Sequence, residues 1–503
     1  MSEARFVSRR RLLRTGGIVG AGVVAMAALA GCGESQVVTE TKIERVIVEV
    51  PVEKVVTQIV EKEKIVEKPV EKIVTQIVEK EKIVEKVVTV VTGPTKPAVI
   101  ELNVINVEAY GPEEDKIVFD GYYKIFTDQT GIKIKNTLLP ENDQINVKML
   151  TMIAGGTPPD IAYVHPQYLP GLASKGVLLS VDEYVKKDGI NLSDYYENIL
   201  EYFRFPIPGG PLYGFPWYSG PSLTIFNKTL FDDAGVPDPK SWDAKEQWNW
   251  EKLHEVTQQI ASGEGAERIF GFRALTPSLK VLAPVVWEWG GDLWDADMTN
   301  TLLDKPEAVA ALQQYADLQW KEKVAPTAAE TEGLAGGLKS GRIAIDSWSI
   351  KGTVPSLRDV PFEKGMANFP FGPKGRFVRN GPNSFCIFTA AKFPEEAWEL
   401  MKGMAGPDFF ALANSIGATL PVKKELMRSP EFLASLEPWE DIEVYEQASL
   451  ADKAARLPGT FVQIQTAFTA EFSLVMLGKK TQAEAMEAFA PIAKELLAEA
   501  KEQ

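Results

Sequence analysis

The sequence predicts an α/β fold, because segments with strand patterning alternate with segments of helical periodicity. Between residues 99 and 174 strands and helices follow one another in turn, which is typical of parallel strands joined by crossover helices. The composition, with 45% hydrophobic and 24% charged residues, is that of a folded globular protein. It excludes wholesale disorder, a collagen and a multi-span membrane protein.

The first 31 residues have the features of an export signal and are set apart from the fold. Residues 8–14 (SRRRLLR) resemble a twin-arginine signal, and the Gly/Ala/Val-rich stretch after them is short for a membrane span. Residues 29–32 (LAGC) resemble a lipobox, in which cleavage leaves a diacylated cysteine. We therefore expect residues 1–31 to be a twin-arginine lipoprotein signal peptide, with Cys32 as the lipidation site. The alternative is an uncleaved N-terminal anchor with an incidental cysteine, and the export route in practice, twin-arginine or general secretion, stays open.

Residues 32–97 are predicted to be a lipid-anchored stalk, rich in Val, Ile, Glu and Lys. Residues 52–69 and 70–87 are two copies of one repeat and agree at 16 of 18 positions. Eighteen residues make five turns of an α-helix, so the apolar side chains would form one stripe on a straight helix. The β-branched residues and the prolines at 51 and 69 favour an extended tether instead. Both interpretations make the segment a spacer.

The globular part begins at residue 98. Gly131 marks a helix end, and the Gly-Gly-Thr-Pro-Pro run at 155–159 marks another. Cys386, the one cysteine of the mature chain besides Cys32, lies in an apolar run and is expected to be a small buried hydrophobe. The expected elements are strands at 99–107, 132–138, 160–165 and 384–388, and helices at 117–130, 145–154, 168–174, 395–404, 407–415 and 481–501.

The net charge and the scarcity of reactive side chains exclude several classes of function. The formal net charge of −15 argues against a nucleic-acid binder, and loss of residues 1–31 removes five arginines and Glu3, leaving 49 basic and 68 acidic side chains, or −19. Two histidines and two cysteines leave little material for metal sites or Cys-His catalysis. No P-loop or nucleophile-elbow motif occurs, and Asp295 and Asp297 lack the other oxygen ligands of a calcium loop. We therefore expect no enzyme, no cofactor and no metal site.

Several co-linear sequence blocks carry a family resemblance over about 400 residues. They include 152–161 (MIAGGTPPDI), 212–217 (LYGFPW), 224–231 (TIFNKTLF), 289–292 (WGGD), 369–373 (FPFGP) and 396–398 (EAW). Together they resemble bacterial extracellular solute-binding proteins of family 1, the carbohydrate-uptake group that includes maltose-binding protein. Phe226 stands where the family has tyrosine, and an insertion at 243–247 interrupts the pattern.

The resemblance implies a two-lobed periplasmic-binding-protein type II fold with a three-crossing hinge. Residues 98–503 would form the solute-binding domain, with ligand held between the lobes. The crossings are expected near 217–222, 382–388 and 457–460. Lobe 1 would comprise about 98–217 and 384–456, and lobe 2 about 222–382 and 457–503.

Candidate ligand contacts follow from the chemistry of a sugar, which presents an apolar C–H face and a rim of hydroxyls. Such a ligand calls for aromatic platforms and short polar side chains. The resemblance places Trp348 where many relatives stack a sugar, although Asp346 replaces the family's glycine. Packing in the core is the alternative for each tryptophan. The expected ligand contacts are Trp348, Trp217, Tyr218, Trp289, Trp287, Glu108, His165, Gln167 and Asn383.

The resemblance, the export signal and the stalk together predict a substrate-binding lipoprotein of an ABC importer. It would capture a sugar or oligosaccharide and deliver it to the permease subunits, from the outer face of the bacterial cytoplasmic membrane. A cell-surface glycan-active enzyme is one alternative, because the many acidic residues could include the pair of carboxylates that a glycosidase needs. A solute sensor for a membrane signalling partner is another. The excess of acidic over basic residues argues against a polyanionic ligand, but Arg379 could bind a ligand with one phosphate or carboxylate group.

Overall fold

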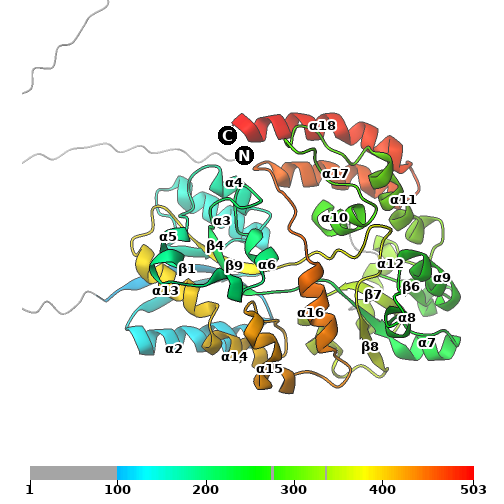
Figure 1. Cartoon of the computed structure of the whole chain (residues 1–503), viewed down its shortest axis with the longest axis horizontal. Coiled ribbons are helices and arrows are strands. Elements are labelled where there is room, and N and C mark those ends of the chain that lie inside the picture. The colour runs from blue at the N-terminus through cyan, green and yellow to red at the C-terminus, as the bar shows by residue number, and fades with distance from the viewer. Residues whose placement is uncertain (1–98, 274–276, 335–336, 503) are drawn as a thin grey trace, which may run out of the picture. The chain divides into compact units, whose positions relative to one another are not determined.

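The computed structural model describes residues 99–273, 277–334 and 337–502. The predicted signal peptide, its lipidation site Cys32 and the predicted stalk lie outside the described residues. From Val99 onward the chain forms one unit with two separate β-sheets, which Figure 1 shows on opposite sides of helix α16 (Ile442–Ala451).

The first sheet has five strands in the order β2-β1-β3-β9-β4. Its strands β1 and β2 pair in parallel along their whole length, and β1 also pairs in parallel with β3. The alternating and apolar runs of the sequence therefore form strands where they were predicted. The bounds are β1 Glu101–Val107, β2 Lys133–Leu139, β3 Ile161–Tyr163, β4 Gly214–Tyr218 and β9 Asn383–Ile387.

The sheet is mixed, where the strand-helix alternation predicted a parallel one. Strand β9 pairs antiparallel with both of its neighbours, β3 and β4. It runs the opposite way because the chain enters it from the second sheet's side. Cys386 in this strand is fully buried between β3 and β4, which confirms the prediction of a small buried hydrophobe.

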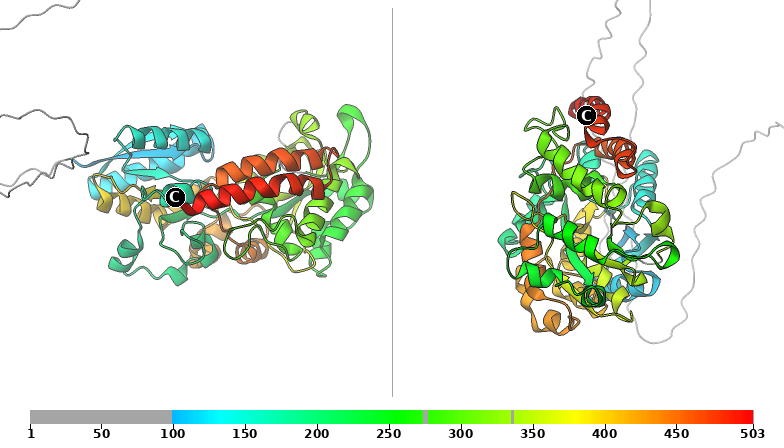
Figure 2. Two further views of the ribbon diagram at one scale, coloured as in Figure 1. Left: turned by 90° about the horizontal axis from the view of Figure 1, so that it is seen from above. Right: turned by 90° about the vertical axis from the view of Figure 1, so that its right-hand side faces the viewer.

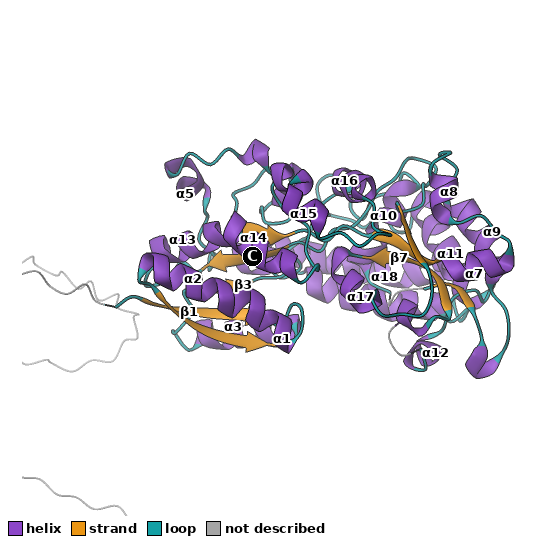
Figure 3. Cartoon of the chain, turned by 90° about the horizontal axis from the view of Figure 1, so that it is seen from below, coloured by secondary structure: helices purple, strands orange, loops and turns teal. Residues whose placement is uncertain are grey.

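Helices cover the first sheet, as Figure 3 shows by colour. Helix α2 packs on β2, α3 on β1 and β2, and α13 on β9 and β4. Gly131 ends α2 in the left-handed conformation, with φ 76°, as its position predicted. The bounds are α1 Pro112–Asp115, a π-helical turn at Lys116–Asp120, α2 Gly121–Thr130, α3 Asn142–Ala154, α4 Leu169–Ala173, α5 Asp182–Lys187, α6 Glu197–Glu201, α13 Pro394–Met404 and α14 Pro407–Ser415.

The second sheet has four strands in the order β6-β7-β5-β8. Its central strands β7 and β5 are buried at every position, so the sheet has helices and loops on both faces. The strands are β5 Leu223–Asn227, β6 Phe270–Phe272, β7 Ile343–Ser349 and β8 Lys364–Ala367; the helices are α7 Lys228–Ala234, α8 Pro239–Asp243, α9 Trp250–Ile260, α10 Leu279–Glu288, α11 Pro306–Trp320 and α12 Ala328–Glu332.

The C-terminal helices α17 (Phe461–Met476) and α18 (Gln482–Glu502) lie side by side (Figure 2). Both contact α11 and join the apolar core of the second sheet through Phe468, Phe472 and Phe489. No described helix combines the length and the apolar run that a membrane crossing needs.

Three chain segments between the two sheets are joined by backbone hydrogen bonds. Pro221 pairs antiparallel with Asn380, and Gly381 donates its N–H to the Gly220 carbonyl at 3.1 Å. Val378 pairs in parallel with Asp452. The two-sheet architecture and the three adjacent linking segments agree with the two lobes and the hinge that the resemblance implied. The lobe limits stay a prediction; within the range expected in lobe 1, α16 packs against β5 of the second sheet.

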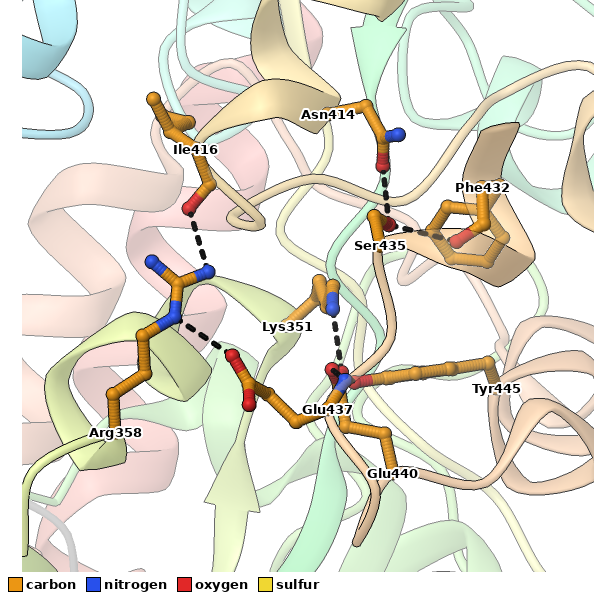
Figure 4. A network of polar contacts seen from close by, with 9 residues as sticks. All are labelled: Lys351, Arg358, Asn414, Ile416, Phe432, Ser435, Glu437, Glu440 and Tyr445. Atoms are coloured by element: carbon orange, nitrogen blue, oxygen red, sulfur yellow. Dashed lines mark hydrogen bonds and ion pairs between the residues drawn. The ribbon is translucent and has the colours of Figure 1, made fainter. Parts of the chain in front are cut away.

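A third apolar cluster lies between the sheets and contains a buried ion pair. The Lys351 ammonium donates to Glu440 Oε1 at 2.5 Å, and both side chains are fully buried. Tyr445 also donates its hydroxyl to Glu440, as Figure 4 shows. The cluster includes α15 (Pro430–Ala434) and α16, so this network joins the chain after β7 to the segment 435–445.

Removing one member of this pair should destabilise the protein strongly. We expect Glu440→Gln to lower the free energy of unfolding by about 3 kcal/mol, because it leaves the Lys351 ammonium buried without a counter-charge. The double variant Lys351→Met/Glu440→Gln should recover part of this loss. Chemical denaturation measures both effects.

The matched control is Glu113→Gln, which removes the carboxylate of an exposed pair with Lys116. It should leave the denaturation midpoint unchanged. Equal effects of Glu440→Gln and Glu113→Gln would contradict a stabilising role for the buried pair.

Candidate functional site

A large cleft opens between the two sheets and has a volume of about 1090 Å³. Its first wall follows the carboxyl ends of β1, β2, β3 and β4, together with the amino end of β9. Its second wall follows the carboxyl end of β7, over residues 350–358. Ligands of α/β proteins bind outside the carboxyl ends of strands, so the position is that of a binding cleft.

Five of the nine candidate contact residues line this cleft. Glu108, His165 and Gln167 follow strands of the first sheet, as the sequence indicated. Tyr218 and Asn383 lie at the expected hinge crossings, at the end of β4 and the start of β9. Tyr163 donates its hydroxyl to Asn383 Oδ1 at 3.0 Å, which orients that amide beside the cavity. The five are Glu108, His165, Gln167, Tyr218 and Asn383.

Trp217 and Trp348 lie in apolar cores and line neither cavity described here. The Trp217 ring packs edge-on against Phe119 and Phe409, with centroids 5.5 and 5.2 Å away. Its neighbour Tyr218 lines the cleft, where the register of β4 with β9 shifts between Pro216 and Tyr218. Trp348 packs on Phe369 at 4.9 Å within the second core. The structure thus gives both tryptophans the packing role that was the alternative to a sugar platform.

Trp287 and Trp289 end helix α10 and differ in surroundings. Trp289 is half-buried and meets Trp250 edge-on at 6.1 Å, away from both cavities. Trp287 donates its Nε1 hydrogen to Asp292 Oδ1 at 3.0 Å and lines a smaller cavity of about 30 Å³. This smaller cavity shares His165, Gln167, Arg379 and Gly381 with the large cleft, so the two adjoin.

Positive charge is concentrated where the two cavities meet. Burial, followed by the nearby Lys280 and Arg379 charges, lowers the pKa of His165 well below its usual value, so its imidazole is neutral at pH 7. Burial and the Arg379 charge lower the pKa of Lys280 to about 7. Lys280 also donates to Gln167 Oε1 at 2.6 Å, which joins α10 to the segment after β3.

Several cleft residues are not among the sequence candidates. Arg358 reaches the cleft from the chain after β7 and is held by Glu437 Oε1 at 2.8 Å and the Ile416 carbonyl at 3.4 Å (Figure 4). The apolar run at 343–349 predicts a strand, and the segment after its carboxyl end would have indicated Arg358 as a cleft residue. Lys280 and Lys453 carry no such signal, because they reach the smaller cavity from a helix start and an irregular segment.

A family model described as bacterial extracellular solute-binding protein matches residues 109–409, which is more than half of the chain. The chain belongs to this family. Among curated members, a binding protein of Brucella abortus is 25% identical over 319 residues, covering 61% of this chain and 73% of the relative. The diacetylchitobiose binding protein DasA of Streptomyces coelicolor is 24% identical over 294 residues, covering 56% and 64%.

Solved structures of the family show the fold. The ABC substrate-binding protein of Listeria monocytogenes in complex with cycloalternan superposes with a TM-score of 0.69 at 21% identity, covering 80% of this chain and 99% of that one. The two-lobed type II fold expected from the sequence is therefore confirmed. The family consists of binding proteins, and among the described residues no three His, Cys, Asp or Glu side chains gather as metal ligands.

Asp452, beside Arg379, provides a pH test of the site's electrostatics. Burial raises the pKa of its carboxyl to about 8, against about 3.9 in an unfolded chain. The folded protein therefore holds one more proton between these values, and its stability falls as pH rises from about 4 to about 8. Relative to Asp452→Asn, the wild type should lose up to about 1.4 kcal/mol per pH unit in this window. Denaturant unfolding at pH 5, 6, 7 and 8 measures the difference.

The exposed Asp297 supplies the control, since Asp297→Asn should shift stability without changing its pH dependence relative to the wild type. Parallel stability curves for the wild type and Asp452→Asn would show that the Asp452 carboxyl is already ionised at pH 5.

Proposed function

We propose that this chain is the solute receptor of an ABC importer, which captures a sugar or oligosaccharide in the cleft and delivers it to the permease. The observation that carries the proposal is the large polar cleft between the two sheets. Its walls combine tyrosine rings with carboxylate, amide and hydroxyl groups, which suit the hydroxyls and the C–H faces of a sugar.

Family membership and the ligands of relatives support the carbohydrate. DasA of Streptomyces coelicolor is named for diacetylchitobiose, and the superposed Listeria monocytogenes structure holds cycloalternan. We infer that Glu108, His165, Gln167, Tyr218 and Asn383 contact the solute, because all five face the cleft. Tyrosines take the place of the expected tryptophan platforms, with Tyr110, Tyr163 and Tyr218 on the cleft wall.

The proposed receptor is exported and tethered by lipid at Cys32. The twin-arginine-like run and the lipobox-like LAGC motif support export and acylation. The repeat segment between Cys32 and Val99 supports a spacer, which would hold the cleft away from the membrane while keeping it near the permease.

A substitution at Glu108 tests whether the cleft binds the solute. We expect Glu108→Ala to weaken the binding of an oligosaccharide ligand about tenfold or more, because a charged hydrogen-bond acceptor contributes about 1.5–3 kcal/mol. Calorimetry against a panel of mono- and oligosaccharides identifies the ligand, and the variant is then titrated with it.

Glu101→Ala is the matched control, since Glu101 is also exposed but begins strand β1 instead of following its end. It should bind as the wild type does. If no saccharide binds the wild type at millimolar concentration, the carbohydrate assignment is wrong.

Acylation is tested separately in a bacterial host that expresses the full chain. Cys32→Ser should abolish incorporation of labelled fatty acid and release the protein from the membrane fraction. Cys386→Ala, which changes the other cysteine, should retain the label. A Cys32→Ser protein that is still labelled would contradict lipidation at this residue.

A further inference from the structure

The smaller cavity, which lies beside the large cleft, is lined by three cationic side chains. Lys280 comes from the start of helix α10, Arg379 from the segment between β8 and β9, and Lys453 from the chain after α16. No acidic residue is among its lining residues, all of which lie in the described part of the chain. This local excess of positive charge runs against the chain as a whole, which carries 69 acidic and 54 basic residues.

The three cations have no carboxylate partner. Across the described residues, none of them lies within ion-pair distance of an Asp or Glu. The Arg379 Nε is buried without a hydrogen-bond acceptor, and the Lys280 ammonium has one neutral acceptor, the Gln167 amide. Lys453 is exposed and lies over the Trp287 ring at 4.5 Å. Burial of Arg379 and Lys280 without a counter-charge is costly, so this arrangement favours an anion that binds there.

Two carboxyl groups lie near the pocket, and neither neutralises it. Asp452 accepts from the Tyr202 hydroxyl at 2.7 Å, and its pKa of about 8 keeps it protonated at pH 7. Asp143 is bonded to the Tyr168 hydroxyl and lines the large cleft; its charge acts on Lys280, less strongly than that of Arg379. The net charge facing the pocket is therefore positive at pH 6.5, where Arg379 and Lys453 are joined by Lys280, whose pKa is about 7.

The positions of the cations are set by the hinge and by packing. The Arg379 carbonyl accepts from the Ser222 N–H at 2.9 Å, so its backbone is part of the paired hinge segments. Lys453 stacks on Trp287, and the N–H of Lys453 donates to the Val378 carbonyl at 3.4 Å. These contacts fix the backbone at Arg379 and Lys453, and the Trp287 ring restrains the Lys453 side chain. Arg and Lys are the side chains that bind planar or tetrahedral oxyanions.

We propose that this pocket of Lys280, Arg379 and Lys453 takes the anionic group of an acidic sugar, whose ring and hydroxyls occupy the adjoining large cleft. The anionic group is a carboxylate or a phosphate, which present the same chemistry to Arg and Lys. A neutral sugar could accept hydrogen bonds from these side chains, but it would leave their charges uncompensated. This inference rests on the proposed function and narrows it to acidic carbohydrates.

The test is calorimetric titration of the purified full chain at pH 6.5 with three groups of probes. The first contains neutral oligosaccharides (maltotriose, cellotriose and diacetylchitobiose). The second contains uronates (glucuronate, trigalacturonate and trimannuronate), and the third contains phosphates (glucose 6-phosphate and glycerol 3-phosphate). We expect at least one uronate or phosphate to bind at least tenfold more tightly than every neutral probe. The group to which it belongs identifies the anion.

Variants then locate the anion. Lys280→Met and Lys453→Met should each weaken binding of the acidic probe at least tenfold, whereas Lys280→Arg should retain most of it. The exposed Lys494 of helix α18 provides the control, because Lys494→Met removes one positive charge that lines neither cavity and should bind normally.

The possible outcomes separate the two proposals. A neutral probe that binds as tightly as the best acidic one overturns the anionic pocket and supports the sugar receptor. Acidic binding that survives both methionine variants overturns this pocket as the anion site. Binding of no probe overturns the inference and also contradicts the carbohydrate part of the proposed function.

Discussion

The buried Asn380 side chain is the constraint on which the arrangement of the two sheets depends. Its Oδ1 accepts from the Gly220 N–H at 2.8 Å, and its Nδ2 donates to Ser219 Oγ at 3.1 Å. Its backbone N–H donates to the Tyr202 hydroxyl oxygen, and Tyr202 in turn donates to Asp452. Asn380 thus links the three segments between the sheets, to the first through its side chain and to the third through its backbone N–H and Tyr202. Both polar atoms of its side chain are used. A network of this kind fixes one arrangement, because any slip of a segment leaves a buried group unpaired.

The hinge also determines which groups reach the cleft. Strands β4 and β9 meet the paired segments directly, so Tyr218 at the end of β4 and Asn383 at the start of β9 lie at the cleft edge of the first sheet. The carboxyl ends of β1 and β3 lie at the same edge because these strands run parallel to each other. Strand direction therefore decides which residues line the cleft. Because β9 runs antiparallel to β3 and β4, its first residue, Asn383, lies at the same edge of the sheet as His165 and Glu108.

Local sequence patterns were sufficient to predict helices and strands. They were insufficient to predict side-chain orientations and contacts that depend on long-range packing. Strand β1, the end of α2 at Gly131 and the buried Cys386 follow from periodicity and turn chemistry within a few residues. Strand ends indicated Glu108, His165 and Gln167, and the expected hinge crossings indicated Tyr218 and Asn383; all five line the cleft. The roles of Trp217 and Tyr218 could not be separated, since the two are adjacent and only the sheet's orientation decides which of them faces the cleft. Lys280 and Lys453 lie far apart in the sequence, so their proximity to Arg379 depends on how the C-terminal segment packs on α10.

The Lys280–Gln167 hydrogen bond would connect the proposed anion recognition with the relative position of the lobes. Lys280 belongs to the second-sheet side and Gln167 to the first, and both line the smaller cavity, so this bond of 2.6 Å links the two sides there. An anion that binds between Lys280 and Arg379 would give the ammonium a charged acceptor in place of a neutral amide. Since hydrogen bonds to charged groups are the stronger ones, the bound anion would hold both sides of the hinge more firmly than Gln167 alone does. Recognition and closure of the proposed receptor would then share one interaction, because a neutral solute lacks the charge needed to replace the Gln167 contact with a stronger one.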